Sequence, residues 1–285
     1  MVVYLEIKKG VYVTSKSYKH DIIFKVINIK DGVCYLKGEE VRLYADSPIN
    51  DLEVVNLTPE VTKNAKDILD KDLIGDRSDY FYLPGKVLHI DGDAEFLKRC
   101  LNFYKEAGVL AIGKKIAEKN IYEQMKFLLS EYRPDIVIIT GHDAYYKKKG
   151  DIHDIRNYKN TENFIKAVKE ARKYEKSHDK LIIIAGACQS NYEELIKAGA
   201  NFASSPKRVN IHALDPAIIA CTVALTKRSE EIDLLTLLEK TKYGKDGIGG
   251  IVGNGVMYVG YPREWFEYWI SKRRDNQEIR ERGRT

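Results

Sequence analysis

The sequence predicts an α/β protein in which a small β-barrel precedes a mostly parallel sheet with helices on both faces. Three observations support this fold class. Residues 8–55 consist of short alternating segments without a helical period. From Pro84 onward, apolar strands alternate with longer amphipathic segments, the pattern of βαβ units. These later strands are apolar throughout, as expected of parallel strands that are buried on both sides.

The N-terminal region predicts an SH3-like β-barrel over residues 1–55. Turn signals such as Lys30-Asp31-Gly32 and Lys37-Gly38-Glu39 separate its apolar segments. The expected strands cover residues 11–18, 22–29, 33–38 and 41–45. Residues 56–82 are charged and weakly apolar, so we interpret them as a linker that holds one exposed helix after Pro59.

The α/β domain is expected at residues 83–262. Strands are expected at residues 86–90, 109–113, 136–140 and 181–185, and helices at residues 93–108, 115–133, 163–174 and 191–199. Two further helices are expected at residues 215–225 and 230–241, followed by a glycine-rich hairpin or edge strand at residues 248–260. Residues 263–285 predict an aromatic helix with a charged tail.

Composition excludes several functional classes. The net charge of +5 is spread along the chain, so nucleic acid is not a predicted partner. Apolar runs such as Ile136–Ile139 fall far short of the roughly 20 residues that span a bilayer, and the N-terminus lacks the features of a signal peptide. The four cysteines form no CxxC motif, which argues against a zinc site or a disulfide framework. We therefore expect a protein of the reducing cytoplasm that needs no cofactor and no metal.

Two of the predicted strands end in a glycine that is followed by a reactive side chain. Gly141 precedes His142 after one strand, and Gly186 precedes Cys188 after the next strand of the pattern. Ligands of open parallel sheets bind beyond the carboxyl ends of the strands, and neighbouring strands lie about 5 Å apart. If these two strands are neighbours, the imidazole and the thiol can meet at one edge of the sheet.

This pairing predicts a cysteine nucleophile. A nearby imidazole, or the helix that begins near Asn191, would raise the thiolate fraction of Cys188, and His142 would protonate the leaving amine. Backbone groups around Gly141, Asp143 and Gly186 are the expected oxyanion site. A single free cysteine is more often a buried apolar residue, and that is our prediction for Cys34, Cys100 and Cys221.

Longer motifs resemble known proteases. Residues 186–190, GACQS, with a histidine 46 positions upstream, are similar to the catalytic strand ends of caspases, clostripain and gingipains, although His142 is followed here by Asp143 and not by glycine. A closer resemblance, to the YabG family of sporulation proteases, extends over about residues 8–262. It rests on the segments at residues 37–47, 83–105, 133–150, 184–206 and 209–216.

The resemblance implies a fold, an activity and partners. It implies a caspase-like three-layer sandwich and a cysteine protease that cleaves after a basic residue. The implied partners are spore-coat or germination proteins, with self-cleavage as a further possibility. The implied location is the mother-cell cytoplasm or the developing spore coat.

A pocket for a basic side chain needs a buried carboxylate. Asp91, Asp93 and Asp143 lie at the right edge of the sheet, and resemblance to arginine-specific relatives favours the first two. Asp93 also suits the N-cap of the following helix, so Asp91 and Asp93 can divide these roles in either way. Asp215 is a fourth, more distant candidate.

Other polar residues have simpler interpretations. His89 and His212 are expected to be structural, and a metal site built from His89, Asp93 and His142 is the lesser alternative. Residues 145–160 are basic and aromatic, typical of a solvated loop or of a flexible self-cleavage segment. A competing hypothesis for the whole chain is a non-catalytic spore-assembly or nucleic-acid-binding adaptor that acts through its barrel.

Overall fold

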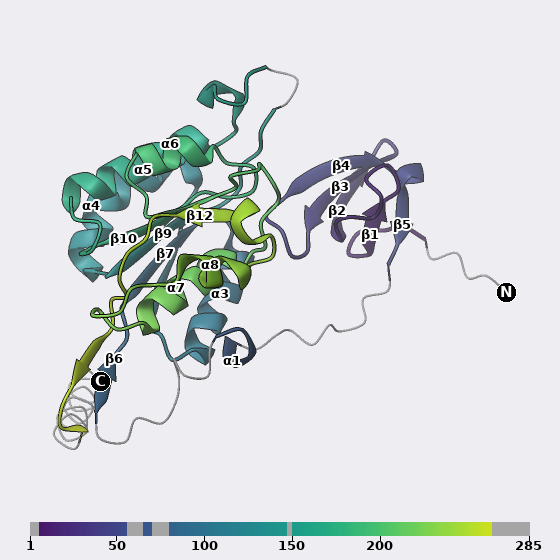
Figure 1. Cartoon of the computed structure of the whole chain (residues 1–285). Helices are drawn as coiled ribbons and strands as arrows, with labels where there is room; N and C mark the ends of the chain where they lie inside the picture. The colour runs from purple at the N-terminus through teal and green to yellow at the C-terminus, as the bar shows by residue number, and fades with distance from the viewer. Residues whose placement is uncertain (1–5, 56–64, 70–79, 147–149, 264–285) are drawn as a thin grey trace, which may run out of the picture.

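The computed structural model describes residues 6–55, 65–69, 80–146 and 150–263 and contains three β-sheets. Figure 1 shows a small N-terminal sheet beside a larger sheet that has helices on both faces. The predicted α/β class with a separate all-β N-terminal region is confirmed.

The N-terminal sheet is antiparallel and has the strand order β4-β3-β2-β1-β5. Its strands are β1 Tyr12–Ser15, β2 Phe24–Lys30, β3 Val33–Gly38, β4 Tyr44–Pro48 and β5 Leu52–Val54. Pro48, which has no N–H to donate, ends β4, and the 3₁₀ turn Ile49–Asp51 leads directly into β5. Among the described strands, no ladder joins β4 to β5, so the predicted SH3-like region is an antiparallel sheet that does not form a closed barrel.

The main sheet has the order β12-β11-β10-β9-β7-β8. Its strands are β7 Val87–Asp91, β8 Ala111–Lys115, β9 Ile136–Thr140, β10 Ile182–Ala185, β11 Phe202–Ser204 and β12 Ile248–Gly250. All neighbouring pairs are parallel except β11 with β12, which is antiparallel. The first five strands follow the doubly wound order 2-1-3-4-5, and sheets of this order bind ligands beyond their strand carboxyl ends.

Alternate residues of the central strands face two separate cores. Ile136 and Ile138 pack in one core with α3 and α7, whereas Val137 and Ile139 pack in the other with α4 and α5. Figure 1 shows α3, α7 and α8 on one face of the sheet and α4, α5 and α6 on the other. The helices are α3 Ala94–Glu106, α4 Ile121–Tyr132, α5 Thr161–Tyr174, α6 Tyr192–Lys197, α7 Asp215–Leu225 and α8 Leu234–Glu239. The chain therefore forms the predicted three-layer sandwich.

Two helix starts lie at the carboxyl edge of the main sheet. Asp93 caps α3, since its carboxylate accepts the N–H groups of Glu95 and Phe96. Asn191 caps α6 in the same way through the N–H of Glu194. Short loops thus connect β7 to α3 and β10 to α6, and each loop holds its side chains close to the strand end.

The region after the N-terminal sheet is only partly described. Helix α1, Ala65–Ile68, contacts α3, and Ala65 and Leu69 are buried, so the helix expected here is not an exposed one. Strand β6, Phe81–Leu83, pairs with β13, Tyr258–Gly260, in a two-stranded sheet. The predicted C-terminal helix and tail after residue 263 lie outside the described residues. Among the helices that are described, none is long and apolar enough to cross a membrane.

The turn between β3 and β4 joins the N-terminal sheet to the α/β domain. Val41, in this turn, is buried in the core beside α7 and forms an antiparallel bridge with His212. Glu40 accepts the backbone N–H of Ala213 and pairs with Lys242 at 3.0 Å. The turn, residues 39–43, therefore belongs to the packing of the main sheet.

Candidate active site

Three neighbouring strands of the main sheet end at the predicted site. Asp91 of β7 lies opposite Thr140 of β9, and Ile139 of β9 lies opposite Ala185 of β10. His142 and Cys188 therefore follow adjacent strand ends, with Asp91 on the next strand. The prediction that the two glycine-ended strands are neighbours is confirmed.

His142 is held by acceptors on both ring nitrogens. Its Nε2 lies 3.1 Å from Oδ2 of Asp93, and its Nδ1 lies 3.0 Å from the carbonyl oxygen of Arg42. Because a carbonyl only accepts, Nδ1 carries the proton of that hydrogen bond. The ring packs against Tyr44 and Phe96, with centroid distances of 4.6 and 6.2 Å. The imidazole is thus fixed in orientation from three sides.

Glu118 is a site residue that sequence reasoning missed. It begins a 3₁₀ turn, Glu118–Asn120, and its carboxylate accepts the backbone N–H of His142 at 2.8 Å. A Cβ at either Gly92 or Gly141 would collide with this carboxylate. Gly92 and Gly141 follow neighbouring strands, and each leaves room for the Glu118 carboxylate. In the sequence, these two glycines were therefore the sign that a side chain enters this edge of the sheet.

Cys188 lies in the turn between β10 and α6 and is completely buried. Its thiol donates to the carbonyl oxygen of Ile211 at 3.7 Å. Burial raises the pKa of the Cys188 thiol to about 12, so the thiol is neutral in this conformation. Burial of the sulfur therefore opposes the expected thiolate in this conformation.

The backbone beside Cys188 is strained. Gln189 has φ of 57°, a left-handed conformation that side chains rarely adopt. Its backbone N–H donates to Val209 at 3.0 Å, and its side-chain amide bonds Asn210. Such strain persists only where the surroundings hold it, and it is concentrated at functional sites.

The predicted oxyanion residues have different roles. Gly186 donates its N–H to Ile139 at 3.0 Å, so that group is already used. In the part of the chain that the structure describes, no acceptor is bonded to the backbone N–H of Asp143 or of Cys188. Gly141 admits the Glu118 carboxylate, as described above. Two unused donors therefore flank the strand ends that carry His142 and Cys188.

The side chain of Asp143 links two loops of the site. Its carboxylate is buried and accepts hydrogen bonds from the hydroxyls of Thr161 and Ser190 and from the backbone N–H of Asn160. Burial raises the pKa of Asp143, and these hydrogen bonds oppose the rise. Asp143 thereby ties the loop of His142 to the loop of Cys188.

Asp91 is paired with a buried arginine. Arg42 and Asp91 have no exposed surface, and Nη2 of Arg42 lies 2.7 Å from Oδ2 of Asp91. Burial alone would raise the pKa of Asp91, but the charge of Arg42 outweighs it and holds this pKa at about 2. Of the carboxylates predicted to read a basic side chain, Asp91 is the one that contacts a buried guanidinium. Nothing in the sequence marked Arg42 as a residue of this site.

Asp93 contacts the imidazole of His142 and Lys37. Besides capping α3, its carboxylate lies 3.0 Å from Nζ of Lys37 on β3. Burial opposes ionisation of Asp93, but hydrogen bonds from His142 and Lys37 lower its pKa. Asp93 is therefore placed to orient His142.

Replacing Asp93 by asparagine should separate this orienting role from the helix cap. Asparagine caps helices as well as aspartate does, so the thermal midpoint of unfolding should change little. The charge beside His142 disappears, however, and kcat should fall by about 10- to 1000-fold for every substrate. Steady-state kinetics on arginyl and neutral peptides measure this, with KM for the arginyl peptide expected to stay unchanged. A loss of activity that is confined to arginyl peptides would instead indicate that Asp93 binds the basic side chain of the substrate.

His89 and His212 have structural contacts. His89 is completely buried, and its Nδ1 bonds the hydroxyl of Tyr104 at 2.8 Å. Nδ1 of His212 accepts the backbone N–H of Leu214. The backbone N–H of His212 donates to the carboxylate of Asp215 at 2.8 Å. Asp215 is thus bonded at the start of α7 and does not contact the guanidinium of Arg42.

The pair of His212 and Asp215 should give the chain a defined response to acid. Burial lowers the pKa of His212 to about 4 from its ordinary 6.5. Between these values the unfolded chain binds a proton that the folded chain does not, so stability falls as the pH falls. Asp215 acts in the opposite sense, because burial raises its pKa to about 6 and the folded chain holds its proton below that pH.

Comparing His212→Asn with the unchanged chain isolates the histidine contribution. When the pH falls from 7 to 4, the free energy of unfolding should decrease by about 1–3 kcal/mol less in the variant than in the unchanged chain. Urea denaturation at both pH values measures the difference. Equal losses in the two proteins would mean that His212 is protonated as readily in the folded as in the unfolded chain.

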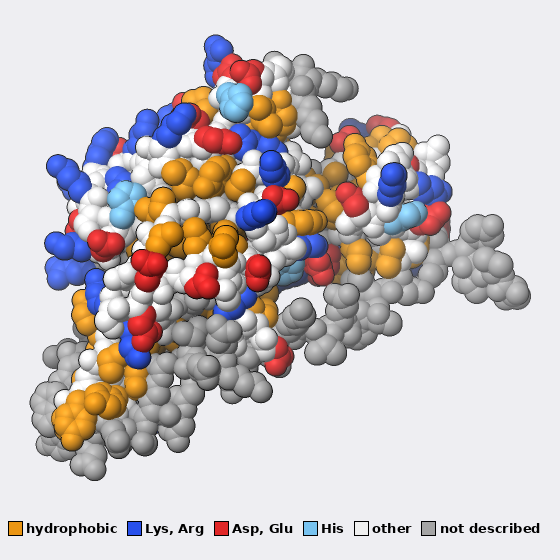
Figure 2. Space-filling model, viewed as in Figure 1, with side chains coloured by type: hydrophobic (Ala, Val, Ile, Leu, Met, Phe, Trp, Pro, Cys, Tyr) orange, Lys and Arg blue, Asp and Glu red, His pale blue; other side chains and the backbone are white. Residues whose placement is uncertain are grey.

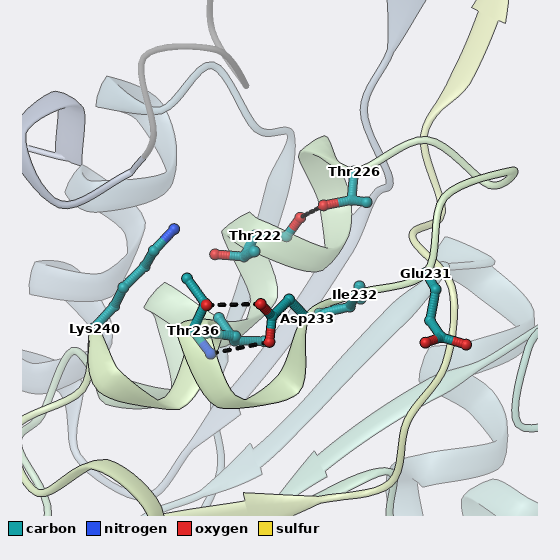
Figure 3. A pocket seen from close by; sticks show the side chains of 8 residues that line it. Thr222, Thr226, Glu231, Ile232, Asp233, Thr236 and Lys240 are labelled. Carbon is teal, nitrogen blue, oxygen red and sulfur yellow. Dashed lines mark hydrogen bonds between the residues drawn. The ribbon is translucent and has the colours of Figure 1, made fainter.

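A cavity between α7 and α8 is separate from this site. It has a volume of about 120 Å³, and three threonines are among the residues that line it (Figure 3). Their hydroxyls are already bonded, since Thr222 donates to the backbone of Ile218, Thr226 to the backbone of Thr222, and Thr236 to Asp233. Its lining includes none of the strand-end residues, so it does not extend the site of Cys188 and His142.

Sequence comparisons point to one family. The family described as YabG peptidase U57 matches residues 8–73 and 62–262 of the chain. The sporulation-specific protease YabG of Bacillus subtilis (strain 168) is 41% identical over 286 residues, which cover 90% of this chain and 99% of the relative. The family match extends over the N-terminal sheet and the three strand ends described above.

Proposed function

Because the chain belongs to the YabG peptidase U57 family, we propose that it is a cysteine endopeptidase that cleaves after basic residues, with arginine preferred. One observation carries this proposal. Cys188 and His142 follow paired strands at one edge of the sheet, and Asp91, on the next strand, binds a guanidinium there. This combination offers a nucleophile, a proton carrier and a receptor for a basic side chain within one site.

The proposed reaction passes through a thioester. When the Arg42 carbonyl no longer accepts from Nδ1 of His142, that nitrogen takes the thiol proton as the Cys188 sulfur bonds to the substrate carbonyl carbon. The carbon–nitrogen bond then breaks, and His142 gives the proton to the leaving amine. Water hydrolyses the thioester, which restores the thiol and leaves a carboxylate on the new C-terminus. Asp93, at 3.1 Å from the imidazole, keeps the ring in place through these steps.

The oxyanion that forms on the carbonyl needs donors that no other group uses. The backbone N–H groups of Asp143 and Cys188 meet that requirement within the described residues. Asp143 is the position at which the similar caspase strand end has glycine, and a backbone N–H serves whichever side chain is present. An aspartate after His142, in place of the glycine of caspases, is therefore compatible with this oxyanion site.

Specificity for arginine follows from the surroundings of Asp91. The carboxylate is completely buried, and it meets a guanidinium that also donates to the carbonyl of Ala213. A guanidinium can bond a carboxylate and a carbonyl at once through its fixed fork, whereas the lysine ammonium is a point charge. Arginine before the scissile bond should therefore be preferred over lysine.

The biological setting is proposed from the relative. The B. subtilis protein is named a sporulation-specific protease, so we place this chain in sporulation, acting on spore-coat or germination proteins. The mother-cell cytoplasm or the developing coat is the corresponding location. On the face in Figure 2, cationic and anionic side chains are intermixed, which gives no support there to a nucleic-acid-binding adaptor.

Cleavage of a defined protein substrate tests the proposal. The full chain is incubated with a purified arginine-rich protein, and the new termini are mapped by mass spectrometry. We expect fragments whose C-terminal residue is arginine, with fewer that end in lysine. Absence of cleavage, or termini without a basic residue, would refute the proposed specificity.

A further inference from the structure

Residues 39–43 enter the site in the manner of a bound peptide. Val41 pairs antiparallel with His212, and the backbone N–H of Ala213 donates to the carbonyl of Glu40 at 2.8 Å. Extended peptides bind proteins in this way, by adding a strand whose backbone bonds give affinity and whose side chains fill pockets. Val41, only 1% exposed, fills an apolar position beside Ile211.

Arg42 occupies the basic pocket. Its Nη2 donates to Asp91 at 2.7 Å and its Nη1 donates to the carbonyl of Ala213, also at 2.7 Å. Phe96 covers the guanidinium with its ring centroid 5.4 Å away. The Nε atom of Arg42, although buried, has no partner among the described residues. Burying a charged arginine costs a large desolvation energy, so such a pair is weak evidence of a purely stabilising role.

The carbonyl group of Arg42 lies beside the reactive residues. Its oxygen accepts from Nδ1 of His142 at 3.0 Å, and the Arg42 backbone lies close enough to Cys188 to lower the pKa of that thiol against the effect of burial. The chain turns immediately afterwards, since the N–H of Leu43 donates to the carbonyl of Val41 at 2.8 Å. The carbonyl of the peptide bond between Arg42 and Leu43 is therefore the one that contacts His142, and the Arg42 backbone is near Cys188.

We propose that residues 39–42 are an internal substrate and that Cys188 cleaves the Arg42–Leu43 bond of its own chain. This inference rests on the proposed function, and it goes further by naming a bond and the state of the pocket before cleavage. Until residues 39–42 leave, Arg42 excludes any outside arginine from Asp91.

The bonds that form and break are the same as for an outside substrate. The Cys188 sulfur forms a thioester with the Arg42 carbonyl carbon, and the bond to the Leu43 nitrogen breaks. That nitrogen receives the Nδ1 proton of His142, and the thiol proton replaces it on the ring. Water then releases Arg42 with a free carboxylate, restores the thiol, and leaves a chain whose N-terminal residue is Leu43.

Incubation of the purified full chain tests this assignment. We expect two fragments, residues 1–42 and 43–285, and N-terminal sequencing of the larger one should read LYADS. Because both reacting parts lie in one chain, the rate should not change over a 100-fold dilution. A rate that rises in proportion to concentration would mean that one molecule cuts another, which contradicts the geometry.

Two arginine variants sharpen the test. Arg42→Lys keeps the cation but loses the fork, and cleavage should slow by at least tenfold. Arg156→Gln is the matched control, since Arg156 is 84% exposed in the basic loop and pairs only with the adjacent Asp154 among the described ion pairs. Cleavage after Arg42 should continue unchanged in this control. Cleavage after Arg156 in the original chain would overturn the assignment in favour of that loop.

Failure of this inference can be told apart from failure of the proposed function. If the chain cuts an outside arginyl substrate while its own Arg42–Leu43 bond stays intact, the internal-substrate assignment is wrong and the protease assignment holds. If neither bond is cut, both are wrong. Thermal unfolding of Arg42→Lys, compared with the original chain, shows whether a slower cut reflects a folding defect.

Discussion

Replacement of Cys188 by alanine should reduce peptide-bond cleavage by at least about 1000-fold. Loss of the sulfur removes the only atom that can form the thioester, and no neighbouring group of the site can replace it. The fold should survive, because Cys188 is buried and its thiol makes only long contacts, such as 3.7 Å to Ile211. Quantitative mass spectrometry of arginyl-protein fragments measures the loss.

A matched control comes from another buried cysteine. Cys221 lies within α7 in the apolar core, so Cys221→Ala should retain activity. Circular dichroism should report the same fold for both variants. Full activity in Cys188→Ala would disprove the nucleophile, and equal losses in both variants would indicate a packing defect.

Replacement of Asp91 by asparagine should have two large effects. Arginyl substrates should lose on the order of 2–5 kcal/mol of transition-state stabilisation, because a charge-assisted pair in a buried pocket disappears. The folded chain should also lose about 3–5 kcal/mol, because Arg42 is left buried without its counter-charge. Peptide kinetics and urea denaturation measure these effects separately.

A double variant distinguishes the two effects of Asp91→Asn. Adding Arg42→Met removes the unpaired charge, so most of the lost stability should return while arginyl cleavage stays low. Cleavage of a peptide with a neutral residue before the scissile bond should change far less. If the double variant regains arginyl cleavage as well, Asp91 is not the receptor for the substrate, and its pairing with Arg42 is only structural.

The central strands could be predicted because consecutive apolar residues in the sequence indicate that these strands are buried. Residues 136–139 and 181–185 are uninterrupted apolar runs, which an exposed element would not contain. Strand β11 has only three residues, Phe202–Ser204, and its alanine and serine resemble a loop. It forms because β10 and β12 offer partners on both sides, which is a property of the tertiary fold.

The candidate site was predictable in part for the same reason. His142, Cys188 and Asp91 are found from strand ends alone, since the carboxyl edge of a parallel sheet collects them. Arg42 could not be found in this way, because it lies in a charged turn and arginine is usually exposed. Its burial depends on Asp91 and Ala213, which lie 49 and 171 positions further along the chain.

This separation in sequence bears on how the chain behaves during its synthesis. Arg42 leaves the ribosome before Asp91, His142 and Cys188 are made, and domains fold in order from the N-terminus as they emerge. The main sheet therefore closes around an arginine that is already present. A newly translated copy passes through no stage with a completed, empty pocket, so unrelated nascent chains nearby are not exposed to an open protease.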